Sequence, residues 1–281
     1  MMNRDYLINK IISLAIEEDV ESGDITTNAL VPDATRAVAE MSAKADGVIS
    51  GLEIARMVFA KFDDHIKWTP FALEGGVVSK GDIIVRIEGS YRALLTAERT
   101  ALNIIQRMSG IATATSHYVK ELAGTHTQLL DTRKTAPGMR ILDKMAVKAG
   151  GGTNHRMGLY DMALIKDNHI KIAGGITNAV VQVRASAFPG MKIEVEVTNL
   201  EETQEAIDAG ADIIMLDNMS TAMMAEAVKL IAGRAATEAS GNMTLSRISE
   251  VASAGVDYIS VGALTHSVTA LDISMNIVPS K

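Results

Sequence analysis

Short apolar runs recur along the second half of the chain, and each is followed by a helical pattern. The runs are QLLDTRK, MALIKDN, IEVEVTN, DIIMLDN, ATEASGN and YISVGAL. Their centres lie about 20 to 35 residues apart, which is the spacing of strand–helix units in a parallel sheet. So many units predict an α/β barrel, although the segment is short for the usual eight strands. We therefore expect an open, incomplete barrel of six to seven strands, with GGTNHR as the candidate for a further short strand.

Two stretches of the first half follow a helical period. The apolar side chains of residues 1–20 share one face; they are Ile8, Ile11, Ile12 and Ala15. Residues 96–122 predict one long helix, or two helices joined near Gly110, with Thr96 as the cap. Arg99 then lies in the first turn, where the helix dipole disfavours a cation. An anionic partner elsewhere would explain it, and a surface salt bridge is the simpler alternative.

Residues 75–90 alternate apolar and polar side chains around Lys80-Gly81-Asp82, which predicts a β-hairpin. The segment is superficially similar to lipoyl and biotinyl carrier domains. It has no lysine between small or Met neighbours at the tip of the hairpin. Ordinary sheet structure is therefore the better interpretation.

Composition narrows the class of protein. The chain has 281 residues, 47% of them hydrophobic, and no apolar run approaches the roughly 18 to 20 residues that span a bilayer. The N-terminus has no signal-peptide pattern, so we expect a cytoplasmic protein that binds no membrane. The absence of cysteine excludes disulfides, thiolate nucleophiles and Cys-ligated metals. The net charge of −7 argues against a nucleic-acid surface.

Cations nevertheless gather in one part of this acidic chain. Residues 131–170 contain seven Lys or Arg against four Asp, before two histidines are counted. Polar or small residues also follow the predicted strands, in this order: Arg133, Lys134, Lys166, Glu196, Asp217, Ser240, Gly241 and Gly262. Because the carboxyl ends of parallel barrel strands converge on one face, we expect these residues to form one site.

The strand IEVEV places carboxylates inside the barrel. Its period of two puts Ile193, Val195 and Val197 on the face toward the helices, so Glu194 and Glu196 point into the lumen. A buried carboxylate is costly unless a cation or a metal lies nearby. Glu196 together with Asp217 could hold Mg²⁺, which binds through few carboxylates and travels with substrate phosphates. The alternative is a buried ion pair that only fixes packing.

Backbone and side chains around these carboxylates suit phosphates and carboxylates of a ligand. Two small-residue turns precede helices and predict a phosphate cradle; they contain Ser240, Gly241 and Asn242, and Gly262 and Ala263. Arg133 and Arg156 can each bind an anion through two hydrogen bonds, while Lys134 and Lys166 act as point charges. His155 can donate to an anion or titrate, although a lone histidine on a strand is more often structural.

At these residues the sequence resembles the quinolinate phosphoribosyltransferase family, also called nicotinate-nucleotide pyrophosphorylase (carboxylating). The shared motifs are EEDVESGDITT, ERTALNIIQRMSGIATAT, DTRKTAPGMR, KAGGGTNHRMGLYDMALIKDNHI, EVEV, MLDN, EASG and SVGALTHS. The resemblance implies phosphoribosyl transfer from phosphoribosyl pyrophosphate to quinolinate, giving nicotinate mononucleotide, pyrophosphate and CO₂ for NAD synthesis. It implies an α/β fold with an N-terminal α/β sandwich domain, residues 1–112, and an open α/β barrel, residues 113–269. The tail 270–281 is expected to pack back on the first domain.

The resemblance also implies roles for individual residues. Catalysis is expected of Lys134, Lys166, Glu196 and Asp217, with Mg²⁺ near Glu196 and Asp217 and no organic cofactor. Substrate binding is expected of Arg99, Thr132, Arg133, Lys134, His155, Arg156, Lys166, Glu196, Asp217, Ser240, Gly241, Asn242, Gly262, Ala263 and His266. Arg99 would reach across the interface of a homodimer, or of a larger assembly of dimers. Many family members have a glycine where this chain has Asn242, so the phosphate contact there departs from the pattern.

Three other functions remain open at this point. A sister phosphoribosyltransferase of the same fold could act on nicotinate without decarboxylation, although three arginines suit the two carboxylates of quinolinate better. A Schiff-base aldolase could use Lys166. A regulator that binds a phosphometabolite would use the cations only to capture its ligand.

Overall fold

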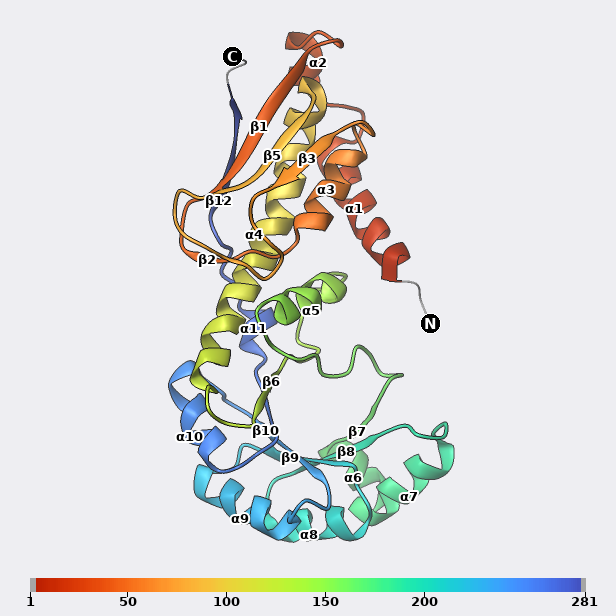
Figure 1. Cartoon of the computed structure of the whole chain (residues 1–281). Helices are drawn as coiled ribbons and strands as arrows, with labels where there is room; N and C mark the ends of the chain where they lie inside the picture. Colours follow the sequence, from red (N-terminus) through yellow and green to blue (C-terminus); the bar gives the residue numbers. More distant parts are fainter. Residues whose placement is uncertain (1–3, 279–281) are drawn as a thin grey trace. The chain divides into compact units, whose positions relative to one another are not determined.

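A computed structural model describes residues 4–278 (Figure 1). Internal contacts divide the chain into two compact units. The first contains the described residues of Met1–Ser116, Thr135–Gly151 and Thr265–Lys281, and the second contains His117–Lys134 and Gly152–Leu264. Residues 135–151 thus group with the first unit, although in chain order they fall inside the predicted barrel.

The first unit is built on a four-stranded antiparallel sheet with the order β12-β1-β5-β3. Its strands are β1 (Arg36–Ala43), β3 (Lys67–Pro70), β5 (Ile83–Ser90) and β12 (Ile273–Val278), and β2 (Gly47–Val48) pairs separately with β4 (Val77–Val78). Its helices are α1 (Arg4–Val20), α2 (Ile25–Leu30), α3 (Leu52–Ala60), α5 (Arg140–Ala149) and most of α4 (Tyr91–Glu121). The predicted N-terminal helix is confirmed, and Ile8 and Ile12 are buried on its apolar face.

Two local predictions for this unit are wrong. The strands β4 and β5 form no hairpin with each other, because β4 pairs with β2 and β5 pairs with β1 and β3. Thr96 does not cap a helix, since α4 already begins at Tyr91, and Arg99 therefore lies beyond its first turn. The helix runs unbroken through Gly110, where a side chain would collide with the backbone oxygen of Thr269.

The second unit contains the six predicted strands as one parallel sheet with the order β6-β11-β10-β9-β8-β7. They are β6 (Gln128–Leu130), β7 (Ala163–Ile165), β8 (Ile193–Val197), β9 (Ile213–Asp217), β10 (Ala236–Ser240) and β11 (Tyr258–Ser260). GGTNHR adds only a single bridge, between Leu130 and Thr153. Because β6 and β7 stand at the two ends of the order, the barrel is open, as the sequence predicts.

Helices cover the outer face of this sheet (Figure 1). They are α6 (Asp167–Ala173), α7 (Ile176–Ser186), α8 (Leu200–Asp208), α9 (Thr221–Ile231), the 3₁₀ turn η1 (Leu245–Arg247) and α10 (Ile248–Ser253). The short helix α11 (Ala263–His266) follows β11 and ends past the unit's last residue. Polar side chains fix where two of them begin: Asn199 accepts the N–H of Glu202 at the start of α8, and Ser220 accepts that of Met223 at the start of α9. Over residues 4–278, no helix is long and apolar enough to cross a membrane.

The register of the strands gathers polar side chains on the inner face. Glu196 of β8 and Glu238 of β10 are both in register with Met215 of β9, which lies between them. One step of two residues further along, Asp217 pairs with Ser240. Because side chains in register on parallel strands share a face, these four polar residues lie on the face opposite the helices.

Candidate active site

A cavity of about 500 Å³ opens at the carboxyl ends of the barrel strands, within the second unit. Most of the predicted site residues line it: Thr132, Arg133, Lys134, His155, Arg156, Lys166, Glu196, Asp217, Ser240, Gly241 and Asn242. Leu164, Met215, Asn218, Glu238 and Ser260 complete its wall. The strands explain most of this convergence, since the other lining residues lie in the parallel strands or directly after them, while His155 and Arg156 follow the single bridge at Thr153.

Two arginines share this wall. Arg133 follows β6, and Arg156 belongs to the NHR segment, where its Nη1 donates to the carbonyl oxygen of Met162 over 3.1 Å. Burial and then the neighbouring charge of Arg133 lower the pKa of Arg156. The protein therefore holds two guanidinium groups close together at an electrostatic cost, which an anionic ligand between them would offset.

A lysine and a glutamate face each other across neighbouring strands. Lys166 follows β7, and its Nζ lies 2.7 Å from Oε2 of Glu196 in β8. The backbone N–H of Lys166 donates to Nδ1 of His169 in the first turn of α6, which fixes the end of the strand. The predicted need of the inward-facing Glu196 for a nearby cation is met by this pair.

The turn after β10 is held by asparagines. Nδ2 of Asn218 donates to Oδ2 of Asp217 over 2.7 Å, and Nδ2 of Asn242 donates to Oδ1 of Asn218 over 3.2 Å. Gly241 has φ of 89°, and a side chain there would collide with Asn218. Asn242 adopts the left-handed conformation, with φ of 50°, so the turn forms although the residue departs from the family's glycine.

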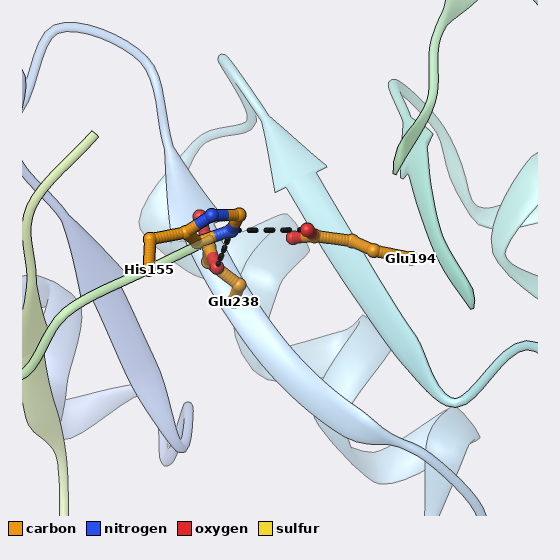
Figure 2. Close-up of side chains that lie close together, drawn as sticks. All are labelled: His155, Glu194 and Glu238. Atoms are coloured by element: carbon orange, nitrogen blue, oxygen red, sulfur yellow. Dashed lines mark ion pairs between the residues drawn. The ribbon is translucent and has the colours of Figure 1, made fainter. Parts of the chain in front are cut away.

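The second inward-facing glutamate, Glu194, belongs to a buried cluster with His155 and Glu238 (Figure 2). Nε2 of His155 lies 3.0 Å from Glu194 and 3.3 Å from Glu238. The side chains of both glutamates are at most 1% exposed. We call these three residues the His155 cluster. The predicted need of Glu194 for a nearby cation or metal is met here by an imidazole.

Four predicted residues do not line the cavity. Gly262 and Ala263 follow β11 in the second unit but are absent from the cavity wall. Arg99 and His266 belong to the first unit, and both are exposed. Their proposed contacts with substrate stay predictions.

Sequence reasoning missed two buried acids that shape the site. Glu238 shares an inner face with Ser240 by the period of two, so the pattern ATEAS carried the signal. Asp131 is fully buried and accepts from the backbone N–H of His155 over 2.9 Å and from Nδ2 of Asn154 over 2.6 Å. Asp131 lies in DTRK next to the cations, and from the sequence alone an acidic residue at such a place is expected to be exposed to solvent.

Comparisons with known proteins find similarity along most of the chain. The family model described as "Quinolinate phosphoribosyl transferase, N-terminal domain" matches residues 24–109, and its C-terminal counterpart matches residues 111–276. A "Probable nicotinate-nucleotide pyrophosphorylase [carboxylating]" of Bacillus subtilis is 42% identical over 96% of this chain and 93% of its own length. A chloroplastic "Nicotinate-nucleotide pyrophosphorylase [carboxylating]" of rice, Oryza sativa, is 44% identical over 97% of this chain and 78% of its own.

A solved structure extends the likeness to three dimensions. The nicotinate-nucleotide pyrophosphorylase of Francisella tularensis superposes with a TM-score of 0.94 at 41% identity, covering 99% of this chain and 98% of that one. The two family models together match most of the chain, and the relatives match nearly all of it. The chain therefore belongs to the quinolinate phosphoribosyl transferase family.

Proposed function

We propose that the cavity binds phosphoribosyl pyrophosphate and quinolinate and transfers the phosphoribosyl group to quinolinate with loss of CO₂. The products are nicotinate mononucleotide, pyrophosphate and CO₂, a step of de novo NAD biosynthesis. The carboxylating pyrophosphorylases among the relatives support this reaction. The structural observation that carries it is the convergence of Arg133, Lys134, Arg156 and Lys166 on one cavity that three carboxylates also line.

The cations suit two anionic substrates held in contact. Quinolinate has two carboxylates, and each can take a pair of parallel hydrogen bonds from Arg133 or Arg156. The lysines supply point charges for the phosphates of the donor. Because the two anionic substrates repel each other, holding them side by side in the cavity would account for a large part of the rate enhancement.

The remaining chemistry follows from charge. As pyrophosphate leaves, positive charge develops on the ribosyl carbon, and the carboxylates of Glu196 and Asp217 stabilise it while the lysines offset the charge of the leaving group. The ring nitrogen of quinolinate then forms the new C–N bond and becomes a pyridinium. This cation accommodates the electron pair left on the ring carbon when the adjacent carboxylate departs as CO₂, and the carbon takes up a proton. These steps require no organic cofactor.

Mg²⁺ fits the two carboxylates as part of this proposal. The ion binds through one or two carboxylates together with substrate phosphates and water. Glu196 and Asp217 both line the cavity, and their contacts with Lys166 and Asn218 hold them in place. When bound, Mg²⁺ would neutralise charge on the pyrophosphate.

The turn Ser240-Gly241-Asn242 is the proposed cradle for the 5′-phosphate, with Gly262, Ala263 and His266 as further contacts. The proposed assembly is a homodimer or a larger assembly of dimers in which Arg99 serves the partner's site. Its exposed position in the first unit supports such a role. The proposed location is the cytoplasm.

Turnover of two bases tests the function. The purified chain is incubated with phosphoribosyl pyrophosphate, Mg²⁺ and either quinolinate or nicotinate, and mononucleotide and CO₂ are followed together. We expect turnover of quinolinate with one CO₂ per mononucleotide. Turnover of nicotinate alone would assign the chain to a sister activity instead.

A further inference from the structure

The His155 cluster consists of three ionisable side chains that are each at most 8% exposed. Glu194 comes from β8 and Glu238 from β10, and both approach the same ring nitrogen of His155 (Figure 2). Among residues 4–278, no group makes a well-directed hydrogen bond to any of their four carboxylate oxygens. Their ion pairs with Nε2 are therefore the interaction that compensates for the loss of water around two carboxylates.

The two glutamates differ in their access to a ligand. Glu238 and His155 line the cavity, whereas Glu194 does not and is fully buried. A ligand in the cavity can therefore touch Glu238, but Glu194 acts on it only through other residues. Because of this difference, a substitution of Glu194 can change ligand binding only through the other residues of the cluster and not by removing a direct contact.

Both ring nitrogens of His155 contact other residues of the protein. Nε2 meets the glutamates, and Nδ1 accepts the backbone N–H of Arg156 over 2.8 Å. The backbone N–H of His155 donates to Asp131 over 2.9 Å. The ring thus ties the barrel strands to the segment that presents Arg156, which in turn reaches the carbonyl oxygen of Met162.

We propose that Glu194 and Glu238 are positioning residues: they grip Nε2 of His155 and so hold the His155-Arg156 segment in the orientation in which Arg156 meets the anionic substrate. In this arrangement His155, which also lines the cavity, serves as an anchor for the neighbouring Arg156. The inference rests on the proposed function, in which Arg156 binds a carboxylate of quinolinate. It identifies the residues that hold Arg156 in place for this contact.

Protonation of the cluster is consistent with this anchor. Burial lowers the pKa of His155, but the two glutamates outweigh it and raise that pKa to about 10. Burial, followed by the charge of Glu238, raises the pKa of Glu194 to about 7 although His155 acts in the opposite direction. The hydrogen bond from Arg156 requires an unprotonated Nδ1. We therefore place the ring proton on Nε2, between the two carboxylates, and assign any further proton to the cluster as a whole.

The kinetic test uses Glu194→Gln, His155→Gln and the variant with both changes. Because a misplaced binding group can cost about 10- to 100-fold, we expect Glu194→Gln to raise the KM for quinolinate by about that factor. The KM for phosphoribosyl pyrophosphate should change much less. The double variant should be no worse than His155→Gln alone, since both changes break the same anchor.

Asp257→Asn is the matched control for losing one carboxylate. Asp257 directly precedes β11, at the amino end of the parallel strands, does not line the cavity and accepts from the backbone N–H of Thr237. This variant should keep the wild-type KM for quinolinate. An unchanged KM in Glu194→Gln, or fully additive effects in the double variant, would overturn the proposal.

A second measurement does not depend on turnover, so it separates this proposal from the proposed function. In ¹⁵N-histidine-labelled protein, the ring signals of His155 are assigned with His155→Gln and followed between pH 5 and 8. We expect no titration in the wild type and a titration near the ordinary histidine value of about 6.5 in the variant with both Glu194→Gln and Glu238→Gln. A wild-type ring that titrates in this range would refute the grip, as would a stoichiometric divalent metal in the purified protein that is lost in Glu194→Gln.

Discussion

At the scale of single residues, burial of charged groups sets the properties of the cavity wall. Glu194 illustrates this, because its carboxyl is fully enclosed and faces Glu238, His155 and the charge of Arg156. Burial raises its pKa from 4.5 to about 7, with Glu238 adding to the rise and His155 opposing it. A carboxyl with a raised pKa binds its proton more tightly in the folded chain than in the unfolded one.

The dependence of stability on pH follows from this sign. The contribution of Glu194 to the free energy of unfolding is fully present below about pH 4.5 and is lost as the pH rises through about 7. The wild type should therefore lose stability relative to Glu194→Gln across this window, and the difference should be constant above it. Urea unfolding at intervals from pH 5 to 8 measures this difference. Parallel curves for the two proteins would show that the carboxyl is not perturbed.

At the scale of elements, the turn after β10 shows how backbone shape could form the proposed phosphate cradle. Gly241 combines a positive φ with a close approach to Asn218, and Asn218 holds Asp217. Gly233, after α9, also has a positive φ, of 74°, but a side chain there would meet no atom within 4 Å. A side chain at Gly233 would therefore strain only the backbone, whereas a side chain at Gly241 would strain the backbone and also collide with Asn218.

Substitution of these two glycines tests the turn. Each Ala variant should lose about 1 kcal/mol of stability, because an alanine in the left-handed region is strained. Only Gly241→Ala should also raise the KM for phosphoribosyl pyrophosphate, by about tenfold or more, since it displaces Asn218 and the proposed phosphate cradle. Steady-state kinetics beside thermal melts distinguish the two effects. Equal KM values in both variants would exclude the turn from donor binding.

The elements also show how far sequence reasoning reaches. The six barrel strands were predictable because each is a short apolar run with a helical segment after it, a local pattern. The hairpin around Gly81 was wrong because β4 finds its partner in β2, about thirty residues earlier, and alternation alone cannot choose a partner. The cap at Thr96 was wrong because packing extends α4 back to Tyr91, against a weak local preference. Glu238 was missed, although it lies two residues before Ser240 just as Glu194 lies two residues before Glu196. In both strands this spacing places the two side chains on the same face.

At the scale of the whole molecule, the predicted site is distributed over two units. The cavity proposed to bind the anionic substrates belongs entirely to the second unit, whereas Arg99 and His266 belong to the first. Chain order did not reveal that residues 135–151 group with the first unit, because this grouping arises from contacts distant in sequence. The proposed assembly gives the exposed Arg99 its anionic partner in a second copy of the chain.

Mixed assemblies test this sharing. A chain with Arg99→Ala and a chain with Lys166→Ala are each expected to have little activity as homo-oligomers. If Arg99 serves the partner's cavity, co-expressed hybrids should recover part of the wild-type activity, because one cavity in each hybrid dimer is intact. Hybrids of Arg99→Ala with Arg99→Lys form the matched control. No recovery in the first mixture would place Arg99 outside the partner's site.

The central claim is that this cavity performs the transfer, and its most direct test is turnover by Lys134→Ala and Glu196→Ala under saturating quinolinate, phosphoribosyl pyrophosphate and Mg²⁺. Removal of one group that stabilises charge in the transition state costs about 100- to 1,000-fold in kcat. Both variants should lose kcat by a factor of this size, while thermal melting should show that the fold is retained. Turnover at the wild-type rate in either variant would contradict the claim.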